Sequence, residues 1–264
     1  MELELSTLIL LFLTGLFAGG IDAIAGGGGL VSVPILLSVG ISPAQTLATN
    51  KLQSSIGTSI ACYSYWRHGL IKFSALKVPI IFTIIGSALG SIAIQFLEGQ
   101  TLEALIPILL ICFAVYFYFS PRISDEDSHQ RLTMSTFGFL IGTTVGFYDG
   151  FFGPGTGSFF AIAFVSLLGF NMTKATANTK VLNLCSNLGA LSMFLIGGHV
   201  LWAIGLTMAA GQIIGAKIGS GLAVKNGSKL IKPVLVTVSI AMSTKLIWEQ
   251  YHSEIMQFIH NIIA

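Results

Sequence analysis

The sequence predicts an all-α integral membrane protein, a polytopic helical bundle of two inverted repeats, each with a short broken or re-entrant helix after a Gly-rich break. Three observations predict this fold. Only 9% of the 264 residues are charged and 53% are hydrophobic, whereas a soluble domain devotes about 25% of its residues to charge. Apolar runs of bilayer length recur along the chain. An aspartate followed by a glycine cluster occurs at Asp22 and again at Asp149.

The composition also excludes several classes of protein. A soluble fold with a mean hydropathy of +0.84 would expose large apolar patches and aggregate, so we expect a lipid bilayer around this chain. The net charge of +2 predicts no nucleic-acid partner. Cys62, Cys112 and Cys185 lie inside apolar runs with neither metal-ligand nor disulfide spacing. We therefore expect them to be packing residues, and we expect no metal site and no cofactor.

The membrane-spanning segments follow from the length of the apolar runs. A bilayer core of about 30 Å requires about 20 apolar residues per helix. The ranges that meet this length are 5–25, 44–65, 74–97, 104–120, 132–152, 176–196, 202–224 and 233–250. The first begins with Glu2 and Glu4 rather than basic residues, so we expect it to be a permanent segment and not a signal peptide.

Two further apolar segments, 30–40 and 157–169, are too short for a comfortable crossing, and each follows a glycine cluster. Short segments of this kind are typical of half-helices or re-entrant hairpins whose irregular backbone faces a cavity. The sequence leaves open whether they cross the bilayer or turn back.

The loops predict the orientation, because Lys and Arg are retained on the cytoplasmic side. Basic residues place loops 66–77 and 225–232 inside, and their absence places 98–103 and 197–201 outside. The domain division that we expect is 1–120 as the first membrane repeat, 121–131 as a cytoplasmic linker and 132–264 as the second membrane repeat. Together these assignments predict a multi-pass protein of a bacterial inner or plasma membrane.

The two predicted repeats share three motifs in the same order. The matched ranges are 19–28 with 146–155, 48–51 with 177–180, and 86–91 with 215–220. The basic loop 66–77 matches an uncharged region in the second copy, so the copies are expected to lie inverted in the membrane. Inverted repeats provide a simple route to alternating access, because exchange of the two conformations opens the opposite side.

Four charged residues fall at repeat-related positions within the predicted membrane segments: Asp22, Asp149, Lys51 and Lys180. Each costs about 2.5–3.5 kcal/mol on insertion scales, which favours a functional role. Lys51 and Lys180 would attract an anion, while Asp22 and Asp149 would act in coupling or gating by exchanging a coupling ion, a proton or sodium. The alternative is that the four charges form static ion pairs between helices.

Other polar groups adjoin these charges. Short helices that begin after the glycine clusters would point backbone N–H groups at an anion. The candidate substrate-binding residues at these helix starts are Gly27, Gly28, Gly155 and Thr156. Those beside the lysines are Asn50, Gln53, Asn178 and Thr179, with Ser54, Asn183 and Asn187 nearby. The side chains beside the lysines could equally bond between helices. The small-xxx-small pairs Gly86/Gly90 and Gly215/Gly219 predict close helix packing instead.

The glycine and lysine motifs resemble those of the sulfite-exporter-like (TauE/SafE) family of membrane permeases. The motifs that carry the resemblance are GGIDAIAGGGGLVSVP at 19–34, ATNKLQ at 48–53, FYDGFFGPGTG at 147–157 and ANTK at 177–180. The resemblance covers nearly the whole chain and implies a membrane transporter. It also implies a substrate class of sulfur-containing anions such as sulfite and sulfonates.

These observations lead to two functional hypotheses. The first is a secondary transporter (permease) for a small anion, namely sulfite, a sulfonate or another organosulfur anion, working by alternating access between two repeats. The second is a non-transporting membrane scaffold or anchor subunit of a larger complex. No nucleophile–base grouping and no nucleotide-binding signature occur in the sequence, so we do not expect an enzyme.

Overall fold

The computed structural model describes residues 4–97, 101, 102, 105, 108, 128–231, 233, 234 and 237. Within this part of the chain the secondary structure is helical and contains no strand. The predicted spans 104–120 and 233–250 lie almost wholly outside the described residues, as does most of the linker 121–131.

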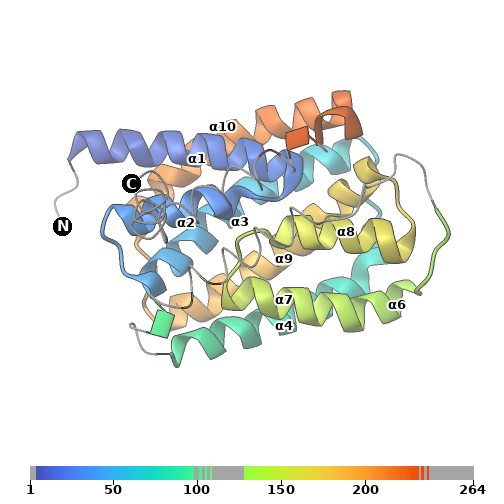
Figure 1. The fold of residues 1–264 in the computed structure, drawn as a ribbon, viewed down its shortest axis with the longest axis horizontal. Helices are drawn as coiled ribbons and strands as arrows, with labels where there is room; N and C mark the ends of the chain where they lie inside the picture. The colour runs from blue at the N-terminus through green and yellow to red at the C-terminus, as the bar shows by residue number, and fades with distance from the viewer. Residues whose placement is uncertain are drawn as a thin grey trace, which may run out of the picture.

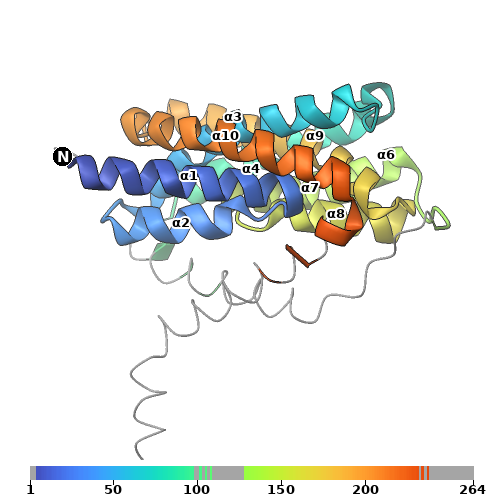
Figure 2. The ribbon, with the colours of Figure 1, turned by 90° about the horizontal axis from the view of Figure 1, so that it is seen from above.

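The helices agree closely with the apolar segments expected from the sequence. Those of the first half are α1 (Leu5–Ala25), α2 (Gly28–Ser38), α3 (Pro43–Arg67), the short 3-10 helix η1 (Phe73–Leu76) and α4 (Lys77–Gln95). Those of the second half are α6 (Met134–Phe137), the π-helical turn η2 (Gly138–Gly142), α7 (Thr143–Phe151), α8 (Thr156–Leu168), α9 (Met172–Ile196) and α10 (Trp202–Asn226). The long helices lie close to the long axis of the molecule (Figures 1 and 2).

The first short segment turns back instead of continuing across the molecule. Helix α1 ends at Gly26, which adopts a φ of +80°, a left-handed conformation that glycine reaches without a steric penalty. Helix α2 then runs back along α1, so that Leu36 near its end packs in one buried cluster with Leu11 of α1. Helices α1 and α2 therefore form a hairpin, which we call the first hairpin.

The second short segment behaves in the same way. Helix α7 ends before Gly153 and Gly155, both of which have positive φ, and α8 returns beside it. The ring of Phe164 in α8 packs against Phe137 at the start of this half, with 4.7 Å between the ring centroids. The two short segments are therefore the returning arms of helical hairpins, and their course relative to a bilayer stays a prediction.

The tips of the two hairpins touch inside the molecule. A Cβ added to Gly26 would lie 2.5 Å from the Cα of Gly157, and one added to Gly157 would lie 2.5 Å from the Cα of Gly26. Ser158 secures the contact by donating a hydrogen bond from its hydroxyl to the carbonyl of Ala25 (2.9 Å). The two glycine breaks thus meet backbone to backbone.

Close helix packing supports this arrangement on both sides. Helix α4 packs on α7 and α10 packs on α1. A Cβ on Gly90 would lie 2.0 Å from the carbonyl oxygen of Phe147, and one on Gly215 would lie 1.9 Å from that of Leu16. The packing role predicted for the small-xxx-small pairs is confirmed, because a larger residue at these positions would force the helices apart.

Equivalent helices of the two halves run in opposite directions along the molecule. Figure 1 shows α1 starting at the end where the N-terminus lies, whereas α6 and α7 start from the other end. The same opposition holds for α3 and α9 and for α4 and α10. Inversion of the halves relative to a bilayer stays a prediction.

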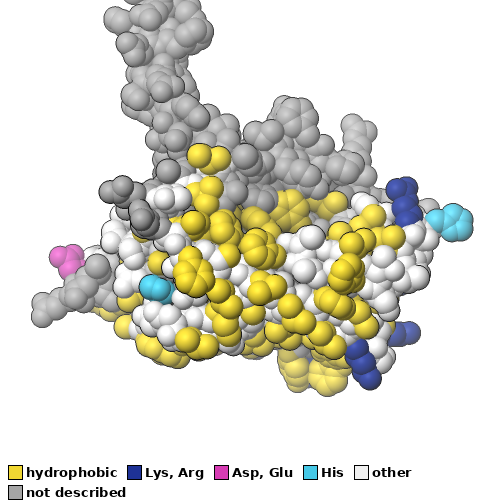
Figure 3. Space-filling model, turned by 90° about the horizontal axis from the view of Figure 1, so that it is seen from below, with side chains coloured by type: hydrophobic (Ala, Val, Ile, Leu, Met, Phe, Trp, Pro, Cys, Tyr) yellow, Lys and Arg dark blue, Asp and Glu magenta, His cyan; other side chains and the backbone are white. Residues whose placement is uncertain are grey.

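The exterior is suited to lipid. Apolar side chains cover much of the face seen in Figure 3, and the Lys and Arg side chains visible there gather at one end. Helices α1 and α9, and the continuous segment formed by η1 and α4, are long and apolar enough to cross a bilayer. Helix α3 is as long as α9, with 25 residues. It differs in carrying a run of buried polar residues, among them Thr49, Asn50 and Lys51, because it lines the interior of the bundle.

Candidate functional site

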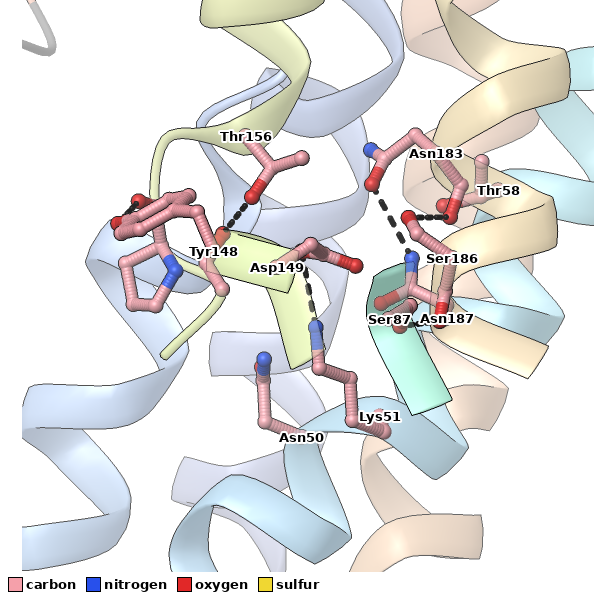
Figure 4. Close-up of polar contacts among 12 residues, drawn as sticks. Asn50, Lys51, Thr58, Ser87, Tyr148, Asp149, Thr156, Asn183, Ser186 and Asn187 are labelled. Atoms are coloured by element: carbon pink, nitrogen blue, oxygen red, sulfur yellow. Dashed lines mark hydrogen bonds and ion pairs between the residues drawn. The ribbon is translucent and has the colours of Figure 1, made fainter. Parts of the chain in front are cut away.

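The first ion pair of the interior joins Lys51 of α3 to Asp149 near the end of α7. The Lys51 Nζ lies 2.8 Å from the Asp149 Oδ1, and both side chains are almost completely buried (1% and 2% exposed). Figure 4 shows the lysine reaching the aspartate beside the second glycine break. A Cβ on Gly153 would lie 2.8 Å from the Lys51 Nζ. Any residue other than glycine at this position would therefore displace the Lys51 ammonium.

The second ion pair joins Lys180 of α9 to Asp22 near the end of α1. The Lys180 Nζ lies 3.6 Å from the Asp22 Oδ2 and also donates a hydrogen bond to the backbone carbonyl of Asp22. The hydroxyl of Thr58 donates a hydrogen bond to the Asp22 Oδ2 (3.3 Å). Lys180 is fully buried, whereas the Asp22 side chain is 13% exposed.

Both ion pairs cross between the halves of the molecule. Each lysine stands on the long helix of one half, and its aspartate belongs to the hairpin of the other half. Two positive and two negative charges are thereby brought together in a low-dielectric interior, where an unpaired charge is strongly unfavourable. The formal charge of this four-residue set, Asp22, Lys51, Asp149 and Lys180, is zero.

A small polar cavity lies between the ion pairs and the hairpin tips; its volume of about 10 Å³ is that of a single water site, so a larger anion would enter only after the surrounding helices move apart. Its lining consists of Asp22, Gly26, Gly29, Asn50, Lys51, Ser54, Asp149, Gly153, Gly155, Gly157, Asn183 and Asn187. These residues come from both hairpins and from α3 and α9. Five of them are glycines, so backbone forms much of the cavity wall.

The cavity presents hydrogen-bond donors as well as charge. The Asn50 Oδ1 accepts hydrogen bonds from the hydroxyl of Ser32 (2.6 Å) and the amide of Gln53 (2.9 Å). This fixes the orientation of the Asn50 amide, and Figure 4 shows its nitrogen pointing in the same direction as the Lys51 ammonium. A buried ammonium and an oriented amide donor are groups that bind anionic oxygens.

The structure brings some of the predicted site residues together and places others elsewhere. Asp22, Asp149, Lys51, Asn50 and Gly155 line the cavity. Of the others, Lys180 is held behind Asp22, and Gln53 bonds Asn50 and Gln212. The buried hydroxyl of Thr179 has no hydrogen-bond partner among the described residues, and Asn178 lines a different cavity. Gly27, Gly28 and Thr156 stand at the starts of α2 and α8, and their neighbours Gly26, Gly29 and Gly157 form the wall instead.

The sequence did not lead us to Thr58, whose hydroxyl donates a hydrogen bond to the Asp22 carboxylate. The signal that could have found it is the helical spacing after each lysine, since residues three, four and seven positions apart lie on one face. Ser54 and Thr58 follow Lys51 at three and seven positions, as Asn183 and Asn187 follow Lys180. The Asn187 amide donates to the Asn183 Oδ1 (3.3 Å), so this face is hydrogen-bonded in both halves.

Comparison with known proteins agrees with this architecture. The family model described as "Sulfite exporter TauE/SafE" matches residues 11–246. The chain belongs to the TauE/SafE family. It is 45% identical to "Probable membrane transporter protein YfcA" of Escherichia coli K12 over 249 residues, which are 94% of this chain and 93% of that protein. No solved structure matches it significantly.

Further relatives carry similar names. A "Probable membrane transporter protein" of Haemophilus influenzae is 42% identical over 95% of this chain and 98% of its own length. "Probable membrane transporter protein YunE" of Bacillus subtilis is 24% identical over 91% of this chain and 97% of its own length. Family and relatives therefore indicate a multi-pass bacterial membrane transporter rather than an enzyme, and they favour transport over the scaffold hypothesis.

Proposed function

We propose that this protein is a secondary transporter of a small anion, with sulfite, a sulfonate or another organosulfur anion as the substrate class. The observation that carries the proposal is the cavity where two buried ion pairs from opposite halves meet beside two glycine breaks. In this proposal Lys51, with Asn50 and the glycine backbone, binds the anion. Lys180 holds the coupling and gating residue Asp22, as Lys51 holds Asp149.

The charge balance of the site supports cotransport with a cation. The four charged side chains cancel, so an anion that entered alone would leave one negative charge uncompensated in a water-poor interior. Such a charge is unfavourable by several kcal/mol. A proton on Asp22 or Asp149, or a sodium ion beside them, restores neutrality. The anion is therefore expected to travel with one positive charge for each negative charge that it carries.

The course of the helices supports alternating access. Equivalent helices run in opposite directions (Figure 1), and each ion pair joins the long helix of one half to the hairpin of the other. A movement of one hairpin away from the opposite long helix would break one pair and open the cavity toward one side. The equivalent movement of the other hairpin would open it toward the other side.

The test is transport of labelled sulfite and organosulfonates into proteoliposomes that contain the purified protein. Lys51→Ala and Lys180→Ala should each reduce the rate by at least about tenfold, because truncation of one partner leaves the other charge buried and unpaired. Lys217→Ala is the matched control, since Lys217 is an exposed lysine of α10. Its rate should equal that of the unmodified protein.

The same vesicles test the coupling. A proton or sodium gradient should drive accumulation, whereas a potassium diffusion potential alone should not, because the loaded site is neutral. Unaltered transport in both lysine variants would remove the lysines from the mechanism. A purified protein that transports no anion, and whose thermal unfolding is unchanged by a panel of anions, would support the scaffold hypothesis.

A further inference from the structure

A chain of buried amide side chains leads from α10 to the central cavity. The Gln212 Nε2 donates a hydrogen bond to the Gln53 Oε1 (3.2 Å), and the Gln53 Nε2 donates one to the Asn50 Oδ1 (2.9 Å). All three side chains are buried, and the last of them, Asn50, lines the cavity. We call Gln212, Gln53 and Asn50 the amide relay. It joins α10 to the wall of the central site through α3.

The direction of the relay is fixed at Gln212. A side-chain amide has a carbonyl end and an NH₂ end of similar shape, so the groups around it decide which end lies where. A Cβ added to Gly57 would lie 1.9 Å from the Gln212 Oε1, so this oxygen lies against the Cα hydrogen of the glycine. A carbonyl oxygen accepts such a weak contact, whereas an NH₂ group in its place would be a buried donor without an acceptor. The Gln212 oxygen therefore stays at Gly57, and its nitrogen points to Gln53.

The relay ends by orienting the Asn50 amide. The Asn50 Oδ1 accepts from Gln53 and also from the hydroxyl of Ser32 in α2 (2.6 Å). Both bonds reach the oxygen, so the Nδ2 is the end left to face the cavity, on the side of the Lys51 ammonium (Figure 4). Toward the cavity, an amide held in this way is a donor and not an acceptor. The wall around Lys51 thus offers an anion a positive charge and a fixed N–H group.

The second half has no such relay among its described residues. The offset of 129 residues that aligns Ala48–Lys51 with Ala177–Lys180 pairs Asn50, Gln53 and Gln212 with Thr179, Leu182 and Thr83, in that order. The hydroxyls of Thr179 and Thr83 are buried and bond no described residue. Helix α9 nevertheless packs on α4 as α3 packs on α10, so this packing does not require the amides. The relay is therefore suited to a task that one half alone performs.

We propose that Gln53 and Gln212 are positioning residues for anion recognition, which act by holding the N–H groups of Asn50 toward the central cavity. Neither glutamine is among the residues that line the cavity, so their effect on an anion passes through Asn50. The ligand that this arrangement favours is an oxyanion whose oxygens all accept hydrogen bonds, such as a sulfonate. The orientation of Asn50 follows from the relay itself, whereas its use in binding an anion rests on the proposed function.

A double-mutant cycle tests this indirect action. Gln212→Met removes the amide but nearly keeps the length of the side chain, and it should raise the Kd of the purified protein for radiolabelled methanesulfonate by about five- to tenfold. In an Asn50→Leu background the same change should raise the Kd by less than about twofold, because the group through which Gln212 acts is gone. In proteoliposomes the KM for methanesulfonate should rise with little change in the maximal rate. Equal losses of affinity in both backgrounds would overturn the proposal.

Further variants separate positioning from packing. Gln53→Leu introduces the residue type that the second half carries at the equivalent place, and Gly57→Ala displaces the Gln212 oxygen. Each should weaken binding as Gln212→Met does. Thr83→Val is the matched control, because it changes the repeat equivalent of Gln212 and removes a hydroxyl that bonds no described residue, and its Kd should stay within about twofold of the unmodified value. A loss in Thr83→Val as large as that in Gln212→Met would assign the effect to helix packing and overturn the proposal.

A measurement without any anion separates the relay from the proposed function. In NMR spectra of protein with isotope-labelled asparagine, the side-chain amide signal of Asn50 is identified by its absence in Asn50→Leu. Gln212→Met should shift this signal, because the amide is no longer held in one orientation, and Thr83→Val should leave it in place. An Asn50 signal unaffected by Gln212→Met would overturn the relay. A shifted signal in a protein that binds and transports neither methanesulfonate nor sulfite would contradict the proposed function and leave the orientation of Asn50 by Gln212 standing.

Discussion

The two crossing ion pairs have the same composition and equivalent places in the two halves, yet they are not equally closed. Lys51 and Asp149 are 2.8 Å apart and almost inaccessible, whereas Lys180 and the Asp22 carboxylate are 3.6 Å apart with Asp22 partly exposed. Lys180 has a backbone carbonyl as a further acceptor, and Asp22 has the Thr58 hydroxyl as a further donor. The second pair is looser and better supported by neighbouring groups, so it can separate at a lower cost.

The largest expected effect is the loss of the Asp149 charge. Asp149→Asn leaves the Lys51 ammonium buried without a counter-charge, and we expect it to reduce the free energy of unfolding by about 3–5 kcal/mol. Asp22→Asn should cost roughly half as much, because Lys180 retains the Asp22 carbonyl and the site is partly exposed. Unfolding in detergent micelles measures both, with Glu4→Gln, an exposed position, as the control. Equal losses would refute the difference between the pairs.

An intermediate effect is expected at the second glycine break. Gly153→Ala adds a Cβ 2.8 Å from the Lys51 Nζ at a φ of +101°, so the ammonium must move away from Asp149 and the backbone is strained. We expect a loss of about 1–3 kcal/mol and slower anion transport. Gly221→Ala is the matched control, because nothing lies within 4 Å of its added Cβ in α10. It should be neutral or stabilising, and a loss at Gly221 as large as that at Gly153 would contradict this explanation.

The smallest expected effect concerns the donor to Asp22. Thr58→Val keeps the shape of the side chain but removes its hydrogen bond to the Asp22 Oδ2, which should cost about 1 kcal/mol. Thr144→Val, which removes a hydroxyl from an exposed part of α7, should change stability by less than about 0.5 kcal/mol. Thermal unfolding of the two variants side by side provides the measurement. An effect of Thr58→Val no larger than that of Thr144→Val would show that Asp22 does not depend on this donor.

The extent of the helices could be predicted from the sequence because lipid requires long apolar runs, and α1 begins and ends where the pattern places it. The fate of the short segments could not be predicted in this way. Whether α2 crosses or turns back depends on the contact of Leu36 with Leu11, and the apolar character of both residues is compatible with either path. The left-handed glycines permit the return, but the packing decides it.

The site was predictable to a similar degree. Buried charge is so unfavourable in a membrane protein that Asp22, Lys51, Asp149 and Lys180 stand out in the sequence. The choice of partners did not follow from the sequence, since the spacing along one chain does not show that each lysine meets the aspartate of the other half. The position of Asn178 away from the central cavity likewise depends on how the start of α9 lies against the loop that contains Leu70.

The contact between Gly26 and Gly157 has a consequence for the design of variants. A methyl group at either tip has 2.5 Å to the nearest backbone atom, whereas ordinary contact begins at 3.4 Å, so the tips would have to separate by several tenths of an ångström. The N–H of Gly26 donates to the carbonyl of Asp22, the same carbonyl that accepts from Lys180. We therefore expect a methyl group at Gly26 to displace the carbonyl that Lys180 uses as an acceptor, four residues earlier in the chain.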